Sequence, residues 1–273
     1  MSPTPTDLRI AIAGLGAIGQ SLARSLHQDP LPGIALVAVS ARNTERAQSW
    51  LDTIKCPAHL CPLEDLEPLA DIVVECAPAP LLRQIATPFL NSGKKVIILS
   101  IGALLFNEDL IELARQTGGR LYVPTGALIG LDAVSAASES QIHSVRMVTR
   151  KPPLGLAGAP HLLENNISVE GLTEPKKVFE GNAKEAARGF PANLNVVVAL
   201  ALAGVGPEKT MLEIWADPTI SRNMHTISVD SDAARFSMTI ENIPSHNPKT
   251  GRIVAQSVRA MLRKMQAPMS VGT

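Results

Sequence analysis

The sequence predicts an α/β protein with two domains: an N-terminal doubly wound domain and a second α+β domain with a mostly antiparallel sheet. Three observations support this prediction. In the first 125 residues, short apolar runs alternate with segments whose apolar residues repeat at helical spacing. A glycine-rich turn joins the first run to the first helical segment. After Pro124, short alternating runs follow one another closely. Uniformly apolar strands separated by helices indicate a parallel sheet with both faces covered, whereas the later pattern indicates antiparallel strands.

The elements of the N-terminal domain have local signals. The first helical segment places Ile18, Leu22 and Leu26 on one stripe. Asn43 can cap the second helix, and Gly93 ends the third. The expected strands are 8–13, 34–40, 72–76, 96–100 and 120–123, and the expected helices are 17–27, 44–51, 81–91 and 108–117.

The later part of the chain has its own order of elements. Helices are expected at 130–138, 183–188, 193–203 and 252–264, and strands at 141–150, 211–216, 223–229 and 235–240. We therefore place a dinucleotide-binding domain at residues 1–125 and a second domain at 126–251. The C-terminal helix, residues 252–266, is expected to pack back on the first domain.

Composition excludes several classes of protein. Twenty-five basic residues balance twenty-five acidic ones, so the chain has no overall electrostatic attraction to nucleic acid or to an anionic membrane. No apolar stretch is long enough to cross a bilayer, and the N-terminus does not resemble a secretory signal. The three cysteines are an odd number, and no second Cys or His pair completes a metal site. We expect a cytoplasmic protein without a bound metal.

The segment Gly14-Leu15-Gly16-Ala17-Ile18-Gly19 follows the first strand and opens the first helix. This is the context in which such glycines bind a dinucleotide in a Rossmann-type domain. The first glycine permits a tight turn, the second lets the backbone approach a pyrophosphate, and the third lets the helix pack on the sheet. Ala17 and Ile18 lie at the helix start, whose N–H groups attract anions. The alternative is a tight structural turn without a ligand.

The second strand ends in Val39-Ser40-Ala41-Arg42-Asn43, without the acid that an NAD site usually places there. Ser40 can bind a ribose hydroxyl or a phosphate, and Arg42 can pair with a 2′-phosphate. The cofactor is therefore NAD or NADP, unless Arg42 is simply a solvated loop residue. The loops that contain Ala77 and residues 100–103 follow later strands and are expected to flank the cofactor.

Six histidines are candidates for acid–base chemistry, and only His225 has a suggestive neighbourhood. It follows a polar turn that contains Asp217, Arg222 and Asn223. Histidine titrates near neutrality and can exchange a proton during hydride transfer. The alternative is a packed histidine with a structural role.

Five ordered motifs, together with the glycine turn, make nearly the whole chain resemble the L-aspartate dehydrogenase family. They are Pro124-Thr-Gly-Ala-Leu-Ile-Gly-Leu-Asp132, Thr149-Arg-Lys-Pro-Pro153, Phe190-Pro-Ala-Asn-Leu-Asn195, Ala216-Asp-Pro218 with Arg222-Asn-Met-His225, and Asn247-Pro-Lys-Thr-Gly251.

The resemblance implies NAD- or NADP-dependent oxidative deamination of L-aspartate to iminoaspartate, which water converts to oxaloacetate and ammonia. It also implies a homodimer, a second domain used for catalysis and dimerisation, and a link to NAD biosynthesis. His225 would be the catalytic histidine. Ala127 and either Asn195, which we favour, or Asn193 would contact the cofactor.

The two carboxylates of aspartate need cationic partners, and Arg222, Lys151 and Lys249 are the candidates. Each of these residues is alternatively a surface charge. Two other functions remain open: a homoserine-dehydrogenase-like oxidoreductase, and an NAD(P)-sensing protein that would keep the glycines but would not need His225.

Overall fold

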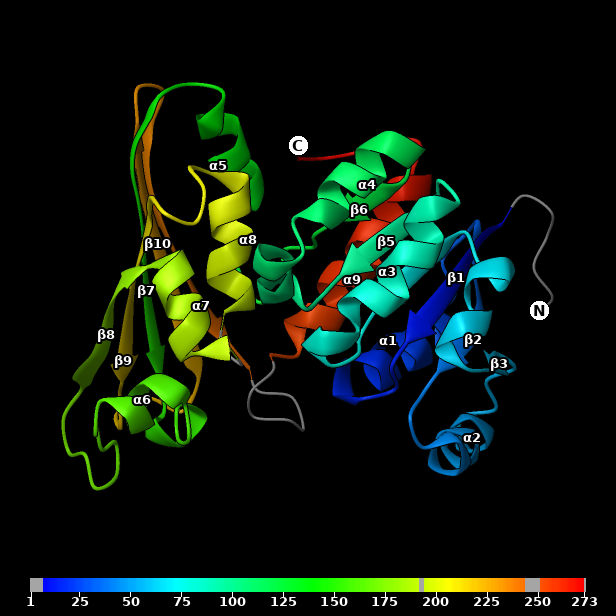
Figure 1. The fold of residues 1–273 in the computed structure, drawn as a ribbon, viewed down its shortest axis with the longest axis horizontal. Coiled ribbons are helices and arrows are strands. Elements are labelled where there is room, and N and C mark those ends of the chain that lie inside the picture. Colours follow the sequence, from blue (N-terminus) through cyan, green and yellow to red (C-terminus); the bar gives the residue numbers. More distant parts are fainter. Residues whose placement is uncertain (1–6, 192–193, 244–250, 273) are drawn as a thin grey trace. The chain divides into compact units, whose positions relative to one another are not determined.

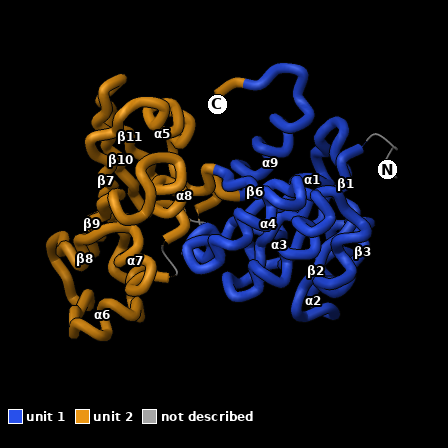
Figure 2. The backbone as a smooth tube through the Cα atoms, turned by 45° about the horizontal axis from the view of Figure 1, so that its top comes forward, with its two compact units in different colours: residues 1–124, 255–270 blue, residues 125–254, 271–273 orange. Residues whose placement is uncertain are grey.

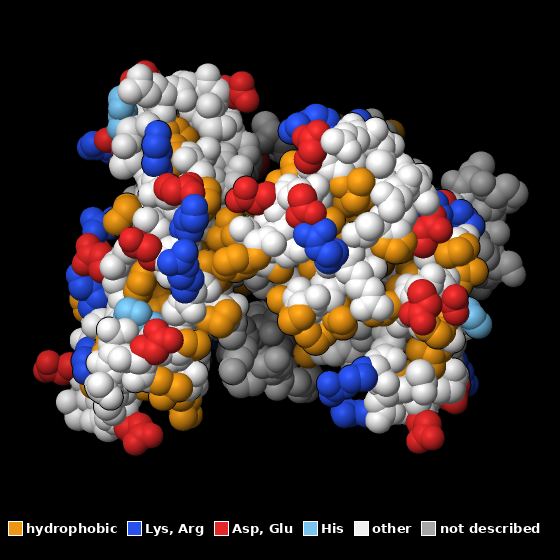
Figure 3. Space-filling view, viewed as in Figure 1, with side chains coloured by type: hydrophobic (Ala, Val, Ile, Leu, Met, Phe, Trp, Pro, Cys, Tyr) orange, Lys and Arg blue, Asp and Glu red, His pale blue; other side chains and the backbone are white. Residues whose placement is uncertain are grey.

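The computed structural model describes residues 7–191, 194–243 and 251–272. The chain forms two compact units (Figure 2). Unit 1 contains residues 1–124 and 255–270, and unit 2 contains residues 125–254 and 271–273. On the face drawn in Figure 3, basic and acidic side chains are interspersed. No helix in the described ranges has the length and apolar character that crossing a membrane requires.

Unit 1 is built on a six-stranded parallel sheet with the order β3-β2-β1-β4-β5-β6. This order confirms the predicted doubly wound fold. From β1 the chain adds β2 and β3 on one side, and it then adds β4, β5 and β6 on the other side of β1. Ligands bind at such a switch point, outside the carboxyl ends of the strands. The strands are β1 (Leu8–Ala13), β2 (Ile34–Ser40), β3 (His59–Leu60), β4 (Ile72–Glu75), β5 (Lys95–Ile98) and β6 (Arg120–Tyr122).

Helices cover the strands of unit 1 (Figure 1). They are α1 (Ala17–Gln28), α2 (Thr44–Thr53), α3 (Leu82–Asn91), α4 (Asp109–Thr117) and α9 (Ile253–Gln266), with short 3-10 turns η1 (Leu63–Asp65), η2 (Glu67–Leu69), η3 (Ala79–Leu81) and η4 (Ile101–Phe106). Arg259 of α9 donates hydrogen bonds to the backbone oxygen and hydroxyl of Ser25 at 2.8 and 2.9 Å and pairs with Asp29. Polar contacts therefore attach the C-terminal helix to α1.

Unit 2 is built on a five-stranded sheet with the order β11-β10-β7-β9-β8. All neighbouring strands are antiparallel except β7 and β9, so the prediction of a mostly antiparallel sheet is confirmed. The strands are β7 (Ile142–Lys151), β8 (Lys176–Asn182), β9 (Thr210–Ala216), β10 (Asn223–Ser231) and β11 (Arg235–Asn242).

Helices α5 (Leu131–Ser138), α7 (Ala183–Gly189) and α8 (Asn195–Ala203) pack on one face of this sheet (Figure 1). The turn η5 (Pro153–Gly155) and helix α6 (Pro160–Glu164) lie between β7 and β8 in the chain.

Three short elements were not predicted. No strand was predicted between residues 51 and 72, but His59 and Leu60 pair with β2. Strand β8 contains Lys176, Lys177 and Glu180, so it lacks the apolar run by which the other strands were found. Helix α6 has only five residues, too few to show a helical repeat.

Alternation along β7 and β10 separates a buried face from a more exposed face of the sheet in unit 2. On β7 the buried face carries Val145 and Met147, followed by Thr149 and Lys151. On β10 it carries His225, followed by Ile227, Val229 and Ser231. Polar side chains on the two strands therefore meet at one end of a largely apolar surface.

Candidate functional site

The turn from Gly14 to Gly19 has a geometry that requires two of its glycines. Gly14 has a positive φ of 106°, and a Cβ atom there would lie 2.6 Å from the backbone oxygen of Cys76. A Cβ atom on Gly19 would lie 1.9 Å from the backbone oxygen of Gly14. These close approaches hold β1, α1 and the end of β4 together.

Gly16 differs, because a Cβ atom there would meet nothing within 4 Å. Gly16 is the N-cap of α1 and provides no side-chain hydrogen bond to the helix. The N–H groups of the first helical turn, which begins with Ala17 and Ile18, have no partner within the helix. The open space above Gly16 therefore fits an anionic group such as a pyrophosphate, which these N–H groups and the helix dipole would bind.

The end of β2 offers one exposed cation. Ser40 is buried, and its backbone oxygen accepts a hydrogen bond from Gly14 at 2.8 Å. The side chain of Asn43 accepts a hydrogen bond from the backbone of Arg46 at 2.8 Å, as expected for the cap of α2. Arg42 is exposed, and the structure shows no ion pair for it among the described residues. Its guanidinium is accessible to an anion.

Glu75, at the end of β4, is a site residue that the sequence analysis missed. Its carboxylate is fully buried and accepts four hydrogen bonds. One oxygen accepts from the Ala77 backbone and the Ser100 hydroxyl, both at 3.0 Å, and the other from the Leu99 and Ser100 backbones at 3.1 and 2.8 Å. The signal was present in the sequence, since Glu75 is an acid at the end of an otherwise apolar strand.

Burial raises the pKa of the Glu75 carboxyl, and the hydrogen bonds from Ser100, Leu99 and Ala77 oppose that rise. All four partners of Glu75 can donate a hydrogen bond, and an ionised carboxylate can only accept them. Glu75 thus joins the loops that follow β4 and β5, the two loops expected to flank the cofactor.

In unit 2, His225 lies directly opposite Thr149 in the register of β10 and β7. The Thr149 hydroxyl oxygen lies 3.1 Å from Nδ1 of His225. His225 is 3% exposed, and Thr149 and Lys151 are each 4% exposed. Burial, followed by the nearby positive charge of Lys151, lowers the pKa of His225 from 6.5 to about 3. The imidazole is therefore uncharged at neutral pH.

The three candidate cations lie in different surroundings. Lys151 is buried, which excludes the surface-charge alternative for this residue. Arg222 is exposed and lies 3.9 Å from Glu241, which is compatible with a surface charge. Lys249 lies outside the described residues. Lys151 lies close enough to His225 for its charge to lower the pKa of the ring.

The expected cofactor contacts of unit 2 lie on a loop and at a helix start. The backbone oxygen of Ala127 accepts a hydrogen bond of 2.9 Å from the side chain of Asn242, which is 3% exposed. Asn195 is the first residue of α8 and is exposed. Asn193 lies outside the described residues, so the choice between the two asparagines stays a prediction.

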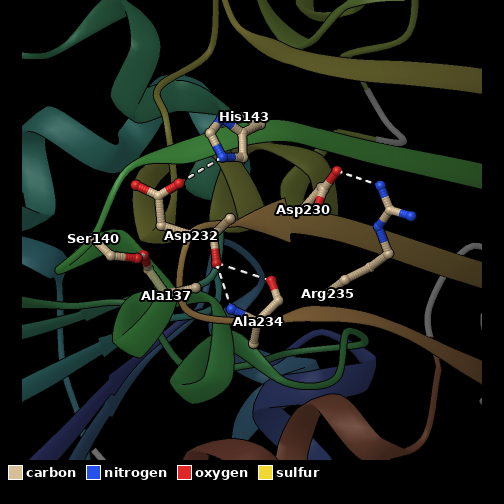
Figure 4. Close-up of polar contacts among 8 residues, drawn as sticks. Ala137, Ser140, His143, Asp230, Asp232, Ala234 and Arg235 are labelled. Carbon is tan, nitrogen blue, oxygen red and sulfur yellow. Dashed lines mark hydrogen bonds and ion pairs between the residues drawn. The ribbon is translucent and has the colours of Figure 1, made fainter.

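Other polar clusters are weaker candidates for a catalytic site. His143 and Asp232 form an exposed pair at 2.8 Å, with Ser140 near them (Figure 4). The Ser140 hydroxyl donates to the Ala137 backbone at 2.9 Å, so these residues lack the serine-to-histidine hydrogen bond of a hydrolase triad.

Within residues 7–191, 194–243 and 251–272, no group of three or more His, Cys, Asp or Glu side chains could hold a metal. The three cysteines are free.

Two family models match the chain. Residues 14–124 match the model described as "Homoserine dehydrogenase, NAD binding domain", and residues 132–265 match "Aspartate dehydrogenase, C-terminal". L-aspartate dehydrogenase 3 of Bordetella bronchiseptica is 58% identical over 267 residues, with 98% of each chain covered. The L-aspartate dehydrogenase of Bradyrhizobium diazoefficiens is 57% identical over 98% of this chain and 95% of its own length. Among solved structures, aspartate dehydrogenase from Thermotoga maritima aligns with a TM-score of 0.75 at 25% identity, covering 97% of this chain and 99% of its own.

Proposed function

Because the chain belongs to the aspartate dehydrogenase family, we propose that it oxidatively deaminates L-aspartate to iminoaspartate, which water converts to oxaloacetate and ammonia, or catalyses the reverse reaction. The chain is an NAD(P)-dependent oxidoreductase. The observation that carries the proposed chemistry is the buried group formed by His225, Thr149 and Lys151 at one end of an apolar sheet face.

Several residues are proposed to contact the cofactor. The turn that contains Gly14, Gly16 and Gly19 holds the pyrophosphate, with the N–H groups of Ala17 and Ile18. The open space at Gly16 supports this assignment. The proposed further contacts are Ser40, Arg42, Ala77, Ala127 and Asn195. When bound, the nicotinamide ring supplies the hydride acceptor.

We assign the catalytic role to His225, which is uncharged and carries a ring nitrogen, Nε2, without a hydrogen-bond partner among the described residues. In this role, His225 would exchange a hydrogen bond or a proton with the group that is bonded to Cα of the substrate. Lys151 is proposed to bind a substrate carboxylate, because its buried ammonium group lies near His225 and can make a charge-assisted hydrogen bond. Arg222 and Lys249 remain further candidate partners for the second carboxylate.

A bound dianion would change the electrostatics of the catalytic group. The charge of Lys151 contributes to the low pKa of His225. A substrate carboxylate near both groups would offset that charge and favour the protonated ring. The proposed substrate therefore raises the pKa of His225 above its value in the free protein.

We propose that Arg42 allows NADP to be used as well as NAD. Its exposed guanidinium follows β2, and residues 39–43 contain no acid. An arginine can pair with a 2′-phosphate, whereas an acid at this place would repel one.

The broader role is proposed from family membership. We propose a cytoplasmic homodimer whose iminoaspartate product feeds NAD biosynthesis. Sedimentation equilibrium of the purified protein measures its assembly, and a mass near that of the 28.9 kDa chain alone would contradict the dimer.

Steady-state assays that follow NAD(P)H absorbance test the function. Purified protein is given L-aspartate or L-homoserine with each cofactor, and in reverse oxaloacetate with ammonium. The proposal expects turnover with L-aspartate and with oxaloacetate plus ammonium. Turnover with L-homoserine alone would favour the homoserine-type alternative. Cofactor binding without any turnover would favour the sensing protein.

A further inference from the structure

We infer that Thr149 is a positioning residue whose hydroxyl donates to Nδ1 of His225, so that the resting ring carries its proton on Nε2. This inference rests on the proposed function only in treating His225 as the catalytic residue. It assigns a role to a side chain outside the glycine turn and the substrate cations. The position of the proton also defines whether Nε2 of His225 offers a substrate a hydrogen-bond donor or an acceptor.

Thr149 and His225 lie next to each other on the buried face of the sheet in unit 2. Thr149 and His225 are register partners on neighbouring antiparallel strands, and both side chains lie on the buried face of the sheet. The hydroxyl oxygen and Nδ1 are 3.1 Å apart, and the two residues are 4% and 3% exposed. The strands on both sides therefore fix the pair, and little water reaches it.

The direction of this hydrogen bond follows from the partners available to the Thr149 hydroxyl. A hydroxyl is both a donor and an acceptor, so the distance alone permits either direction. The contact with His225 is the one hydrogen bond that the structure shows for the Thr149 hydroxyl among the described residues. If Nδ1 carried the hydrogen, the buried hydroxyl hydrogen would have no acceptor there. Buried donors are rarely left unpaired, because the loss of their hydration is not compensated.

The charge of the His225 ring supports the same direction of the hydrogen bond. A protonated imidazolium would donate from both nitrogens, and the hydroxyl would then have to accept. Burial and the charge of Lys151 oppose that state by lowering the pKa of His225. The remaining form is the neutral ring with a bare Nδ1 and an Nε2–H group.

This tautomer changes how the ring can act. Nε2 has no hydrogen-bond partner among the described residues, so its N–H group is available to a ligand. A neutral imidazole N–H can donate a hydrogen bond to a carbonyl oxygen and stabilise the negative charge that develops there. The Nε2–H group of the resting His225 then donates a hydrogen bond to the C2 carbonyl oxygen of oxaloacetate while the ammonia nitrogen adds to C2. The electrons of the C=O π bond move to that oxygen, and a proton lost from the nitrogen ends on it, which gives the carbinolamine. In the other direction, His225 binds the same oxygen in the carbinolamine.

Nitrogen NMR on the full-length, ligand-free protein labelled with ¹⁵N-histidine tests the tautomer directly. The His225 signals are assigned as those missing from the spectrum of His225→Gln. The expected result at neutral pH is an unprotonated Nδ1 and a protonated Nε2. A proton on Nδ1 would overturn the inference.

Two substitutions at Thr149 separate the hydroxyl from the packing. Thr149→Val keeps the branched shape and removes the donor, so the Nδ1-protonated tautomer should gain population and kcat should fall about 10- to 100-fold, as for other groups that orient a functional histidine. KM for the cofactor should stay unchanged. Thr149→Ser keeps the hydroxyl and should restore both the wild-type tautomer and most of the activity.

Thr226→Val is the matched control. Thr226 follows His225 on β10 but points to the other face, where its hydroxyl lies 2.9 Å from that of Thr239. This variant should leave the His225 tautomer unchanged. An unaltered tautomer in Thr149→Val, or an equal loss in Thr149→Val and Thr149→Ser, would contradict the role of the hydroxyl. Since the spectra need no substrate, failure of the wild-type protein to oxidise L-aspartate would sink the proposed function and leave the tautomer result standing.

Discussion

At the scale of single residues, the candidate site residues include ionisable groups that are buried. His225, Lys151 and Glu75 are each less than 5% exposed, although their residue types usually lie at the surface or are paired. The sequence analysis named His225 and Lys151 but could not establish their burial. Whether a strand residue points to the core or to water depends on which face the helices cover, and that is a property of the folded unit.

The low pKa of His225 predicts a pH-dependent stability. The unfolded chain protonates this ring near pH 6.5, whereas the folded chain resists protonation until about pH 3. The folded state therefore loses stability as the pH falls from 6.5 towards 3, and this contribution is absent above that window. At one pH unit below 6.5 the loss from His225 is about 1.4 kcal/mol.

Urea unfolding of the wild type and His225→Gln across this range measures that contribution. The difference in their free energies of unfolding should shift in favour of the variant as the pH falls. The comparison removes the effect of Glu75, whose raised pKa acts in the opposite direction. A difference that does not change with pH would contradict the buried, uncharged ring.

Lys151 is expected to act on both the substrate and His225. Lys151→Met removes the charge and keeps much of the side-chain volume. It should raise the pKa of His225, because the lysine charge is one of the two causes of its low value. It should also raise KM for L-aspartate about tenfold or more, as expected for the loss of a charge-assisted contact worth about 1.5–3 kcal/mol. NMR titration and initial rates measure the two effects, and an unchanged pKa together with an unchanged KM would exclude both roles.

Arg42 offers a test of cofactor choice. Arg42→Ala should weaken binding of NADPH about tenfold, a loss of about 1.4 kcal/mol, and leave binding of NADH nearly unchanged. Fluorescence titration with each reduced cofactor measures the ratio. Arg46→Ala, at a second exposed arginine nearby in the chain, is the control. Equal weakening of both cofactors would show that Arg42 does not read the 2′-phosphate.

At the scale of elements, long apolar strands and the glycine turn could be predicted because their signals are local. The turn needs Gly14 and Gly19 for contacts within a few ångströms of themselves, so the glycine pattern alone indicated it. Strands β3 and β8 could not be found in the same way. Both are formed by pairing with strands elsewhere in the chain, β3 with β2 and β8 with β9, and not by a pattern of their own.

Glu75 connects two loops, and this leads to a prediction at the same scale. In Glu75→Gln, an amide NH₂ replaces one acceptor, so at least one donor among Ala77, Leu99 and Ser100 loses its partner. A buried unpaired donor costs about 1–3 kcal/mol of stability. Both loops are expected to flank the cofactor, so the Kd for NADH should also rise several-fold.

Denaturant unfolding and NADH titration of Glu75→Gln provide the measurement. Glu64→Gln, at an exposed glutamate of unit 1, is the matched control and should change neither quantity. Unchanged stability and unchanged NADH affinity in Glu75→Gln would show that the carboxylate does not organise these loops.

At the scale of the whole molecule, the chain divides its chemistry between two units. Unit 1 contains the glycine turn, Arg42 and Glu75, and unit 2 contains His225, Thr149 and Lys151. The change of pattern after Pro124 is the signal from which two domains were predicted. The arrangement within each unit was not visible in the sequence, because the pairing of β7 with both β9 and β10 joins segments far apart in the chain.

The central claim is that this chain is a dehydrogenase whose turnover depends on His225, and one variant tests it most directly. Turnover of L-aspartate and affinity for NADH are measured side by side for the wild type, His225→Gln and the control His143→Gln, whose histidine lies in an exposed pair. The account predicts that His225→Gln loses about 100-fold or more in kcat while it keeps its NADH affinity, and that His143→Gln keeps both. Full turnover in His225→Gln would contradict the account.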